Sequence, residues 1–386
     1  MNGRLTDEAY ARAALTYLAE PADRRLAQLI RVHGAVVTLA AIKSGRLLGT
    51  TGLAGNAAGP AIKAAMERWR TRLPELPTPE EVLAFGASGI RLVCPGDPEW
   101  PGQLADLADD QPYALWLRGN ADLRFGCLRS VAIVGSRAAT AYGSYVAAEF
   151  AASVAARGLA VVSGGAFGVD AAAHRGALAA DGVTIAVLAC GVDVPYPAAH
   201  AELFDAIAAQ GVLVSEWPPA RRVSRLRFLV RNRMIAALAT GTLVVEAGER
   251  SGAVNTARYA RDLRRRLMAV PGPITSDLSA GCHQIIREWQ GTLVTSAAEV
   301  IEHLSPVGEP GPAARRGSGR AALPRDLLDL ESARVLDAMP GRGGVGTVRV
   351  AQRAGLAPAA TATLLGQLAT GGFVERCDDG WRLRRP

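Results

Sequence analysis

The sequence predicts an α/β protein built on a parallel sheet, with an N-terminal helical module and a C-terminal winged-helix domain. From about 130 to 303, short continuous apolar runs alternate with segments of helical composition. Continuous apolar strands are typical of a parallel sheet that helices cover on both faces. A stretch rich in Pro, Gly and Arg then separates this region from a second compact segment.

Six runs supply the predicted parallel strands, and helices are expected after most of them over 141–158, 169–182 and 198–210. Residues 90–120 are expected to add a short strand, turns and an aromatic strand. The six runs are SVAIVGS (130–136), LAVVSGG (159–165), TIAVLAC (184–190), VLVSE (212–216), TLVVEA (242–247) and RLMAVPG (266–272).

Two domains precede the linker. Residues 1–75 are predicted as a helical, SAM-like module, because apolar residues on both sides of His33-Gly34 indicate two helices around a turn. Residues 76–304 contain the sheet and form the predicted extended Rossmann-like domain.

The C-terminal part begins with a predicted flexible linker over 305–325, which has almost no large apolar residue. Residues 326–386 follow the order helix, turn, helix and hairpin, with the hairpin turn expected at Asp379-Gly380, as in a winged helix. This end of the chain is basic, with 12 Arg against 7 acidic residues over 311–386.

Composition limits the class of protein. The 386 residues are 49% hydrophobic, which excludes global disorder, and the net charge is +7. Only Lys43 and Lys63 are lysines, so Arg-rich codon usage alone could explain the basic charge. The sequence predicts no membrane-spanning helix and no secretory signal. Five scattered cysteines without a CxxC pair favour a reduced, cytoplasmic compartment.

Two glycine-rich loops each follow a strand and open a helix at the predicted carboxyl edge of the sheet. Their backbone N–H groups and the helix N-termini could bind phosphates, and Arg137 adds a guanidinium suited to them. The glycines could equally serve only the tight turns of an α/β fold. The spacing of these two loops fits neither a Walker A motif nor a full GxGxxG. The loop residues are Gly135, Ser136 and Arg137, then Gly164, Gly165 and Gly168.

The segment RRVSRLRFLVRNR (221–233) interleaves six arginines with Phe228 and Asn232. Arginines along a phosphate backbone, with a ring for base stacking, suit unpaired nucleic acid. One alternative is a solvated basic loop whose arginines reflect Arg-rich codon usage. Another is that Phe228 simply packs in the core. The arginines are Arg221, Arg222, Arg225, Arg227, Arg231 and Arg233.

A fourth loop, VVEAGERSGAVNTA, contains Glu246, Ser251 and Gly252. Glu246 could bind a ribose or act as a base, but a buried ion pair with Arg231 or Arg233 is the favoured expectation. No paired carboxylates, HExxH or GxSxG occur, so no hydrolytic site is predicted. No metal and no cofactor are expected.

A series of motifs in order and spacing gives the chain a resemblance to the DNA-processing protein A family of bacteria (DprA, also called Smf), over about residues 90–300. The motifs are GDPEWPGQL, YALWLRGN, VAIVGSRAATAYG, VVSGGAFGVDAAAH, TIAVLACGVDVPYP, LVSEWPP, FLVRNRMIAALA, VVEAGERSGAVNTA and AVPGPI.

This resemblance implies an extended Rossmann-like domain and a dimer that binds single-stranded DNA without acting as an enzyme. It implies protection of incoming strands during natural transformation. It also implies loading of the RecA recombinase, with displacement of single-strand-binding protein.

The resemblance further implies roles for particular residues. The loops at Gly135-Ser136-Arg137 and Gly164–Gly168 would hold phosphates. Arg225 would contact DNA, Phe228 would stack on a base, and Arg231-Asn232-Arg233 would complete the pocket, with Ser251 and Gly252 also at the site. The chain departs from the family pattern at Phe167, His200 and Leu229. Phe167 could stack on a base or pack in the core.

Two alternatives belong to other classes of protein. A nucleoside-monophosphate phosphoribohydrolase of the lysine-decarboxylase-like group shares the core, but its PGGxGTxxE loop is replaced here by LATGTLVVEAG. A winged-helix transcription regulator with an α/β sensing domain would prefer duplex DNA.

Overall fold

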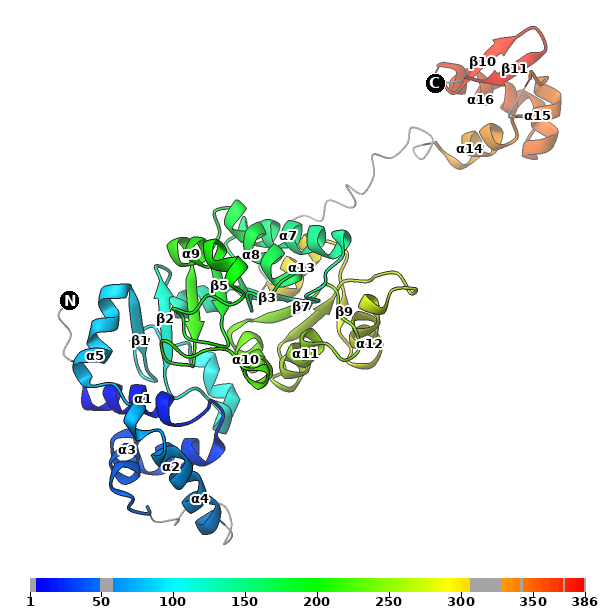
Figure 1. The fold of residues 1–386 in the computed structure, drawn as a ribbon. Helices are drawn as coiled ribbons and strands as arrows, with labels where there is room; N and C mark the ends of the chain where they lie inside the picture. The colour runs from blue at the N-terminus through cyan, green and yellow to red at the C-terminus, as the bar shows by residue number, and fades with distance from the viewer. Residues whose placement is uncertain (1–4, 49–57, 306–327, 341–342, 371, 385–386) are drawn as a thin grey trace. The chain divides into compact units, whose positions relative to one another are not determined.

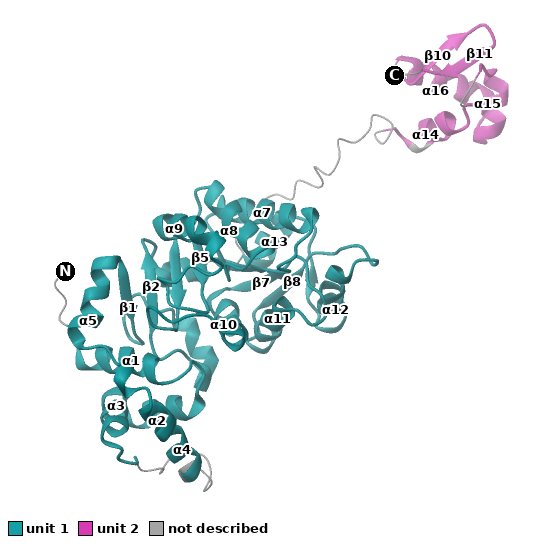
Figure 2. Cartoon of the chain, viewed as in Figure 1, with its two compact units in different colours: residues 1–313 teal, residues 314–386 magenta. Residues whose placement is uncertain are grey.

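The computed structural model describes residues 5–48, 58–305, 328–340, 343–370 and 372–384. The chain divides into two compact units, Met1–Ala313 and Ala314–Pro386, which are described separately (Figure 2). The predicted linker over 305–325 lies outside the described residues, apart from Ser305.

A nine-stranded sheet organises the first unit, in the order β1-β2-β6-β5-β4-β3-β7-β8-β9 (Figure 1). The predicted parallel pairing is confirmed for β3 to β8, and β9 extends it, whereas β2 pairs antiparallel with both β6 and β1. The strands are β1 (Ile90–Val93), β2 (Leu115–Gly119), β3 (Ser130–Val134), β4 (Ala160–Ser163), β5 (Thr184–Val187), β6 (Val212–Ser215), β7 (Gly241–Val244), β8 (Arg266–Ala269) and β9 (Thr292–Leu293).

Helices cover both faces of this sheet, as predicted. The side chains of α7 and α8 share one apolar cluster with α13, whereas α10, α11 and α12 pack on the opposite face. From β3 the chain moves through β4, β5 and β6 on one side and then returns to β7 on the other. The carboxyl ends of β3 and β7 therefore form a topological switch point, where open α/β sheets bind ligands. The helices are α6 (Leu123–Leu128), α7 (Ala141–Ala155), α8 (Val169–Ala179), α9 (Ala201–Gln210), α10 (Arg225–Leu238), α11 (Gly252–Asp262), α12 (Ala280–Glu288) and α13 (Ala297–Leu304).

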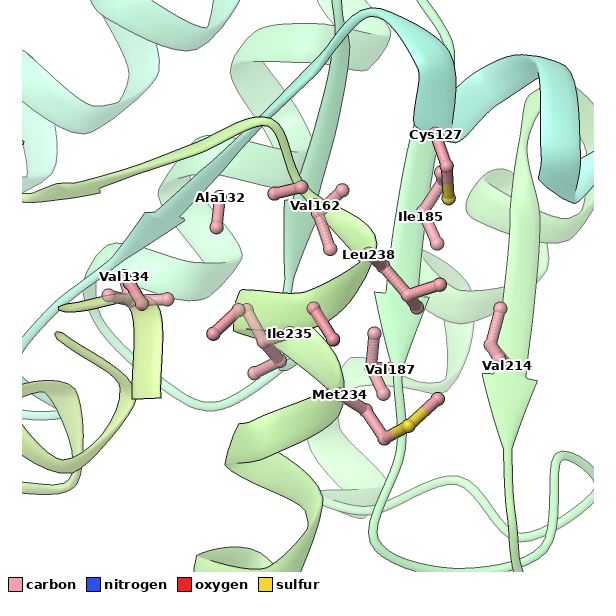
Figure 3. Close-up of a cluster of buried hydrophobic side chains, with 14 of the residues drawn as sticks. Cys127, Ala132, Val134, Val162, Ile185, Val187, Val214, Met234, Ile235 and Leu238 are labelled. Atoms are coloured by element: carbon pink, nitrogen blue, oxygen red, sulfur yellow. The ribbon is translucent and has the colours of Figure 1, made fainter. Parts of the chain in front are cut away.

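The helix α10 has two different halves. Its C-terminal residues Met234–Leu238 are buried on all sides against the strands, next to Val162 and Val187 (Figure 3). A helix segment that is apolar all round belongs in a core. Its N-terminal half carries arginines instead. Because the C-terminal half is buried against the strands, it fixes the position of the N-terminal half at the edge of the sheet.

The N-terminal helical module packs on the antiparallel edge of the sheet. Gly34, with φ of 80°, separates α2 from α3 and confirms the predicted turn. The buried Tyr113, which precedes β2, accepts a hydrogen bond from the Asp23 amide through its hydroxyl at 3.0 Å. The helices of the module are α1 (Asp7–Leu18), α2 (Arg24–His33), α3 (Ala35–Ser44) and α4 (Ala58–Arg70). The helix α5 (Pro79–Ala84) follows the module, and a 3-10 helix, η3 (Gly102–Asp110), lies between β1 and β2.

The second unit contains three helices followed by a hairpin. The last two helices and the hairpin follow the predicted order, and α14 precedes them. Cys377 pairs with Gly380, so the two turn residues are Asp378 and Asp379 rather than the expected Asp379-Gly380. Its assignment to the winged-helix class stays a prediction. The elements are α14 (Leu330–Asp337), α15 (Thr347–Ala354), α16 (Pro358–Thr370), β10 (Val374–Cys377) and β11 (Gly380–Leu383).

Across the described ranges, no single helix has the length and hydropathy needed to cross a membrane. The helices α2 and α3 meet that test only as a pair, and they are bent by 115° at their junction.

We expect Gly176→Ala to destabilise the first unit by about 1–3 kcal/mol, because the new methyl would overpack the interface between α7 and α8. A Cβ at Gly176 would lie 2.1 Å from the Ala148 carbonyl oxygen. The control is Gly86→Ala, whose Cβ would have no neighbour within 4 Å. Urea unfolding measures both variants, and equal midpoints would contradict the prediction.

Candidate nucleic-acid interface

A cleft of about 820 Å³ opens at the switch point of the sheet. The loops that follow β3 and β4 form part of its wall, and α10 with the N-terminus of α11 forms most of the rest. Asp170 of α8, Tyr196 from the loop after β5 and Arg250 from the loop before α11 also line it. Its lining includes nine of the residues predicted from the sequence: Gly135, Ser136, Arg137, Arg225, Phe228, Arg231, Asn232, Ser251 and Gly252. The other five predicted residues, Gly164, Gly165, Phe167, Gly168 and Arg233, do not line it.

Cations dominate the charge of this cleft. Arg137, Arg225 and Arg250 are exposed at its lining, and Arg231 is buried at its inner end. The one carboxylate among the lining residues is Asp170. Exposed guanidinium groups can approach phosphates without a large desolvation cost, so this arrangement suits a polyanion. The sequence prediction did not include Arg250, although it lies in the quoted ERSGAVNTA motif.

The Phe228 side chain lies at the cleft, between Arg137 and Tyr196, rather than in the core. The Arg137 guanidinium carbon is 4.8 Å from the centroid of the Phe228 ring. The Tyr196 ring is 5.6 Å away from the same ring, tilted by 47°, and is 43% exposed. An incoming base could therefore meet two aromatic rings and one guanidinium plane. Tyr196 was missed as a site residue, although it lies near the end of the quoted CGVDVPYP motif.

The buried Arg231 connects α10 to two strand ends. Its Nη1 donates to the Gly164 carbonyl at 2.7 Å and to the Val187 carbonyl. Its Nε is buried without a hydrogen-bond partner among the described residues. Burial lowers the pKa of Arg231 to about 10, although the nearby Asp170 acts in the opposite direction. Arg231 thus holds α10 against the ends of β4 and β5, with Asp170 as its nearby countercharge.

The loop after β4 has its amides occupied by a carboxylate of the protein itself. The amides of Gly164 and Ala166 donate to Asp170 Oδ2 at 3.2 and 3.3 Å. Burial raises the pKa of Asp170, an effect that Arg231 and these amides oppose. These two N–H groups are therefore unavailable to a phosphate unless Asp170 moves.

The glycines of both loops are explained by close packing. A Cβ at Gly164 would lie 2.3 Å from Arg231 Nη1, and one at Gly168 would lie 2.2 Å from the Ser136 carbonyl oxygen. At Gly135 it would lie 2.6 Å from Val169 Cγ2. Close packing therefore requires glycine at these three positions.

The loop after β3 is also held internally. The Ser136 amide donates to the Glu246 carbonyl at 2.7 Å, and Ser136 Oγ accepts from the Ala138 amide at 3.1 Å. The exposed Arg137 side chain is the part of this loop that extends over the Phe228 ring in the cleft.

The expected ion pair of Glu246 with Arg231 or Arg233 is wrong. The Glu246 carboxylate accepts from the Thr140 amide at 2.9 Å and from Thr140 Oγ1 at 2.5 Å. It therefore fixes the start of α7, and the close approach of Gly143 to this carboxylate leaves no room for a larger side chain.

The structure places Arg233 in the protein interior. Its guanidinium forms a bidentate pair with the buried Glu216 at 2.5 and 2.6 Å, and its Nε donates to the Asp110 carbonyl at 3.0 Å. Arg221 and Arg227 also form ion pairs, in both cases with carboxylates of the N-terminal helical module. The segment is thus mostly helical rather than a basic loop, and only Arg225 of the six arginines is both exposed and at the cleft.

Phe167 lies beside the cleft rather than in its lining. Its ring makes an edge contact with His200 at 4.6 Å between centroids, and it is 47% exposed. His200 Nδ1 lies 3.1 Å from the Gly165 carbonyl oxygen. Phe167 is therefore neither core nor cleft lining.

These features define the class: an α/β protein with a basic, aromatic cleft at its switch point and, within the described residues, no cluster of His, Cys, Asp or Glu that could hold a metal. The family model of DNA recombination-mediator protein A matches residues 91–305, and the chain belongs to that family.

Relatives extend the similarity beyond the sheet. A Mycobacterium tuberculosis protein described as a putative DNA processing protein DprA is 42% identical over 388 residues, covering 98% of this chain and 95% of the relative. The Smf protein of Escherichia coli is 40% identical over 212 residues, covering 54% of this chain and 56% of its own length.

Two solved structures share the fold. DNA processing protein A from Streptococcus pneumoniae superposes with a TM-score of 0.60 at 30% identity, covering 78% of this chain and 98% of that one. The protein from Helicobacter pylori, described for its single-stranded DNA binding mode, gives a TM-score of 0.51 at 27% identity, covering 56% and 95%. The predicted family and the α/β fold class are thereby confirmed.

We expect Glu216→Gln to destabilise the first unit by about 3–5 kcal/mol, because it leaves the buried Arg233 charge without its partner. Arg225→Ala, at an exposed position, should change stability by no more than about 0.5 kcal/mol. Chemical denaturation measures both variants. A Glu216→Gln protein as stable as the parent would show that the buried pair is not needed.

Proposed function

We propose that the cleft binds single-stranded DNA and that the chain acts as a non-enzymatic recombination mediator. One observation carries this proposal: the exposed guanidinium groups of Arg137 and Arg225 and the ring of Phe228 line one cleft. Guanidinium groups that follow phosphates, with rings that accept unpaired bases, are the two elements of sequence-tolerant strand binding.

The proposed mechanism is passive. Phosphates contact Arg137, Arg225 and Arg250, and bases lie against Phe228 and Tyr196. The internal bonds of the loops after β3 and β4 favour side-chain contacts to phosphate over backbone contacts. No bond in the DNA is made or broken in this scheme, because the chain needs only to hold the strand unpaired.

The further steps are part of the same proposal. Held strands would be protected and passed to the RecA recombinase with displacement of single-strand-binding protein, in the cytoplasm and during natural transformation. A homodimer would hold two strand segments. Support comes from membership of the recombination-mediator family and from the relatives described as DNA-processing proteins.

Arg137→Ala and Arg225→Ala should each weaken single-strand binding, because each variant lacks one phosphate-binding guanidinium. The slope of log K against log salt should fall in magnitude by about 0.7 for each phosphate that is no longer neutralised. A salt-matched gel-shift series measures both quantities. Arg157→Ala, which removes an exposed arginine near the end of α7, is the matched control. Unchanged affinity in both cleft variants would remove the cleft from the DNA site.

Phe228→Ala should weaken binding by about 1–3 kcal/mol with the salt slope retained, because the variant lacks a stacking surface but keeps its phosphate-binding arginines. Titration with unpaired and duplex DNA at two salt concentrations tests the strand preference. Tighter binding to duplex would instead favour a transcription regulator, and release of free base from AMP would favour a phosphoribohydrolase.

A further inference from the structure

The cleft wall is connected to the N-terminal helical module by ion pairs on either side of it. Arg221 Nη2 lies 2.5 Å from Glu75 Oε2, and Arg227 Nη2 lies 2.7 Å from Glu20 Oε1. Val223, Ser224 and Arg225 lie between these two arginines, and all three line the cleft. The part of the wall that enters α10 is therefore fixed at both ends by the helical module.

Glu20 is the centre of the second attachment. Its Oε2 accepts from Arg227 Nε at 3.0 Å and from the Trp217 indole N–H at 2.9 Å. Arg72 approaches the other oxygen at 3.4 Å. Burial alone would raise the pKa of Glu20, but the hydrogen bonds from Arg227 and Trp217 lower it overall, so the carboxylate stays charged.

Two of the donors to Glu20, Trp217 and Arg227, lie next to and within the 221–233 segment that lines part of the cleft. Trp217 is 2% exposed and lies between the end of β6 and Arg221, the first residue of the 221–233 segment. Arg227 Nη1 donates to the Arg222 carbonyl at 2.5 Å and thereby connects the first turn of α10 to the chain that precedes it. Arg227 also lies between Arg225 and Phe228 in the first turn of α10.

We propose that the helical module is a positioning element of the DNA site, and that Glu20, acting through Arg227, sets the placement of Arg225 and Phe228. This inference rests on the proposed function of the cleft. Glu20 does not line the cleft and is a positioning residue. A hydrogen-bond and ion-pair network with a defined arrangement can couple the position of one residue to binding at another site.

Removing the Glu20 charge has opposite expected effects on DNA binding, depending on whether Glu20 acts by its charge or by positioning Arg227. Neutralising an acid near a polyanion site removes a repulsive charge and frees the Arg227 cation, so it should strengthen DNA binding. Loss of positioning should weaken binding. The sign of the change therefore separates the two causes.

The test uses the full chain and a fluorescently labelled single strand at fixed salt. We expect Glu20→Gln to weaken binding about three- to tenfold. Glu8→Gln is the matched control, because Glu8 also pairs with an arginine of the module, Arg12 at 2.7 Å, on the helix α1. That control should bind DNA as the parent does.

A double-mutant cycle adds a measurement that general destabilisation would not reproduce. Arg227→Lys should weaken binding by a similar factor, and the double variant with Glu20→Gln should be no weaker than the worse single variant, because both changes break one interaction. Glu75→Gln provides a second variant with little folding risk, since its side chain is 47% exposed. It should also weaken binding.

Circular dichroism at the assay temperature establishes that each variant is folded. Equal or tighter DNA binding by folded Glu20→Gln and Glu75→Gln variants would overturn the positioning role. If Arg225→Ala then still weakens binding, the proposed function stands without it. If Arg225→Ala and Arg137→Ala also leave binding unchanged, the function of the cleft itself is overturned.

Discussion

The cleft depends on the hydrogen bonds that the buried Arg231 guanidinium donates to the strand ends beneath it. The guanidinium connects α10 to the ends of β4 and β5 through the Gly164 and Val187 carbonyls. A buried charge needs such hydrogen bonds, because an isolated cation in the interior is costly. The nearby Asp170 balances the charge and holds the loop after β4 by two amides. These hydrogen bonds form without a ligand, and groups that are held in place beforehand reduce the ordering cost of binding.

The same logic divides the arginines of residues 221–233 by task. Arg233 is an internal brace, and Arg221 and Arg227 are attachments to the N-terminal module. Arg225 remains for the ligand. A segment that resembles one basic surface in sequence is thus mainly a scaffold that presents one exposed arginine and one ring at the cleft. This division also explains how a module distant in sequence can affect the cleft.

Much of the fold follows from local pattern. Continuous apolar runs predict the parallel strands, because both faces of those strands are buried. Gly34 predicts the turn between α2 and α3, and the glycine-rich loops predict the edge of the sheet at which the cleft lies. The positions of Arg137, Arg225 and Phe228 in one cleft also agree with the site expected from the sequence. These features depend only on residue type and spacing, and both can be read from the amino-acid sequence.

The family, the strand-helix alternation and the segments that meet at the switch point could all be predicted from the amino-acid sequence. Which charges are paired inside the protein could not, because those pairs form only in the packed fold. Glu246 fixes the start of α7 through Thr140, Glu216 holds Arg233, and Glu20 holds Arg227. Such pairings join residues far apart in the chain, and many Glu–Arg combinations are chemically equivalent in the sequence alone. Burial and distance select among them, and both exist only once the sheet and its helices are packed.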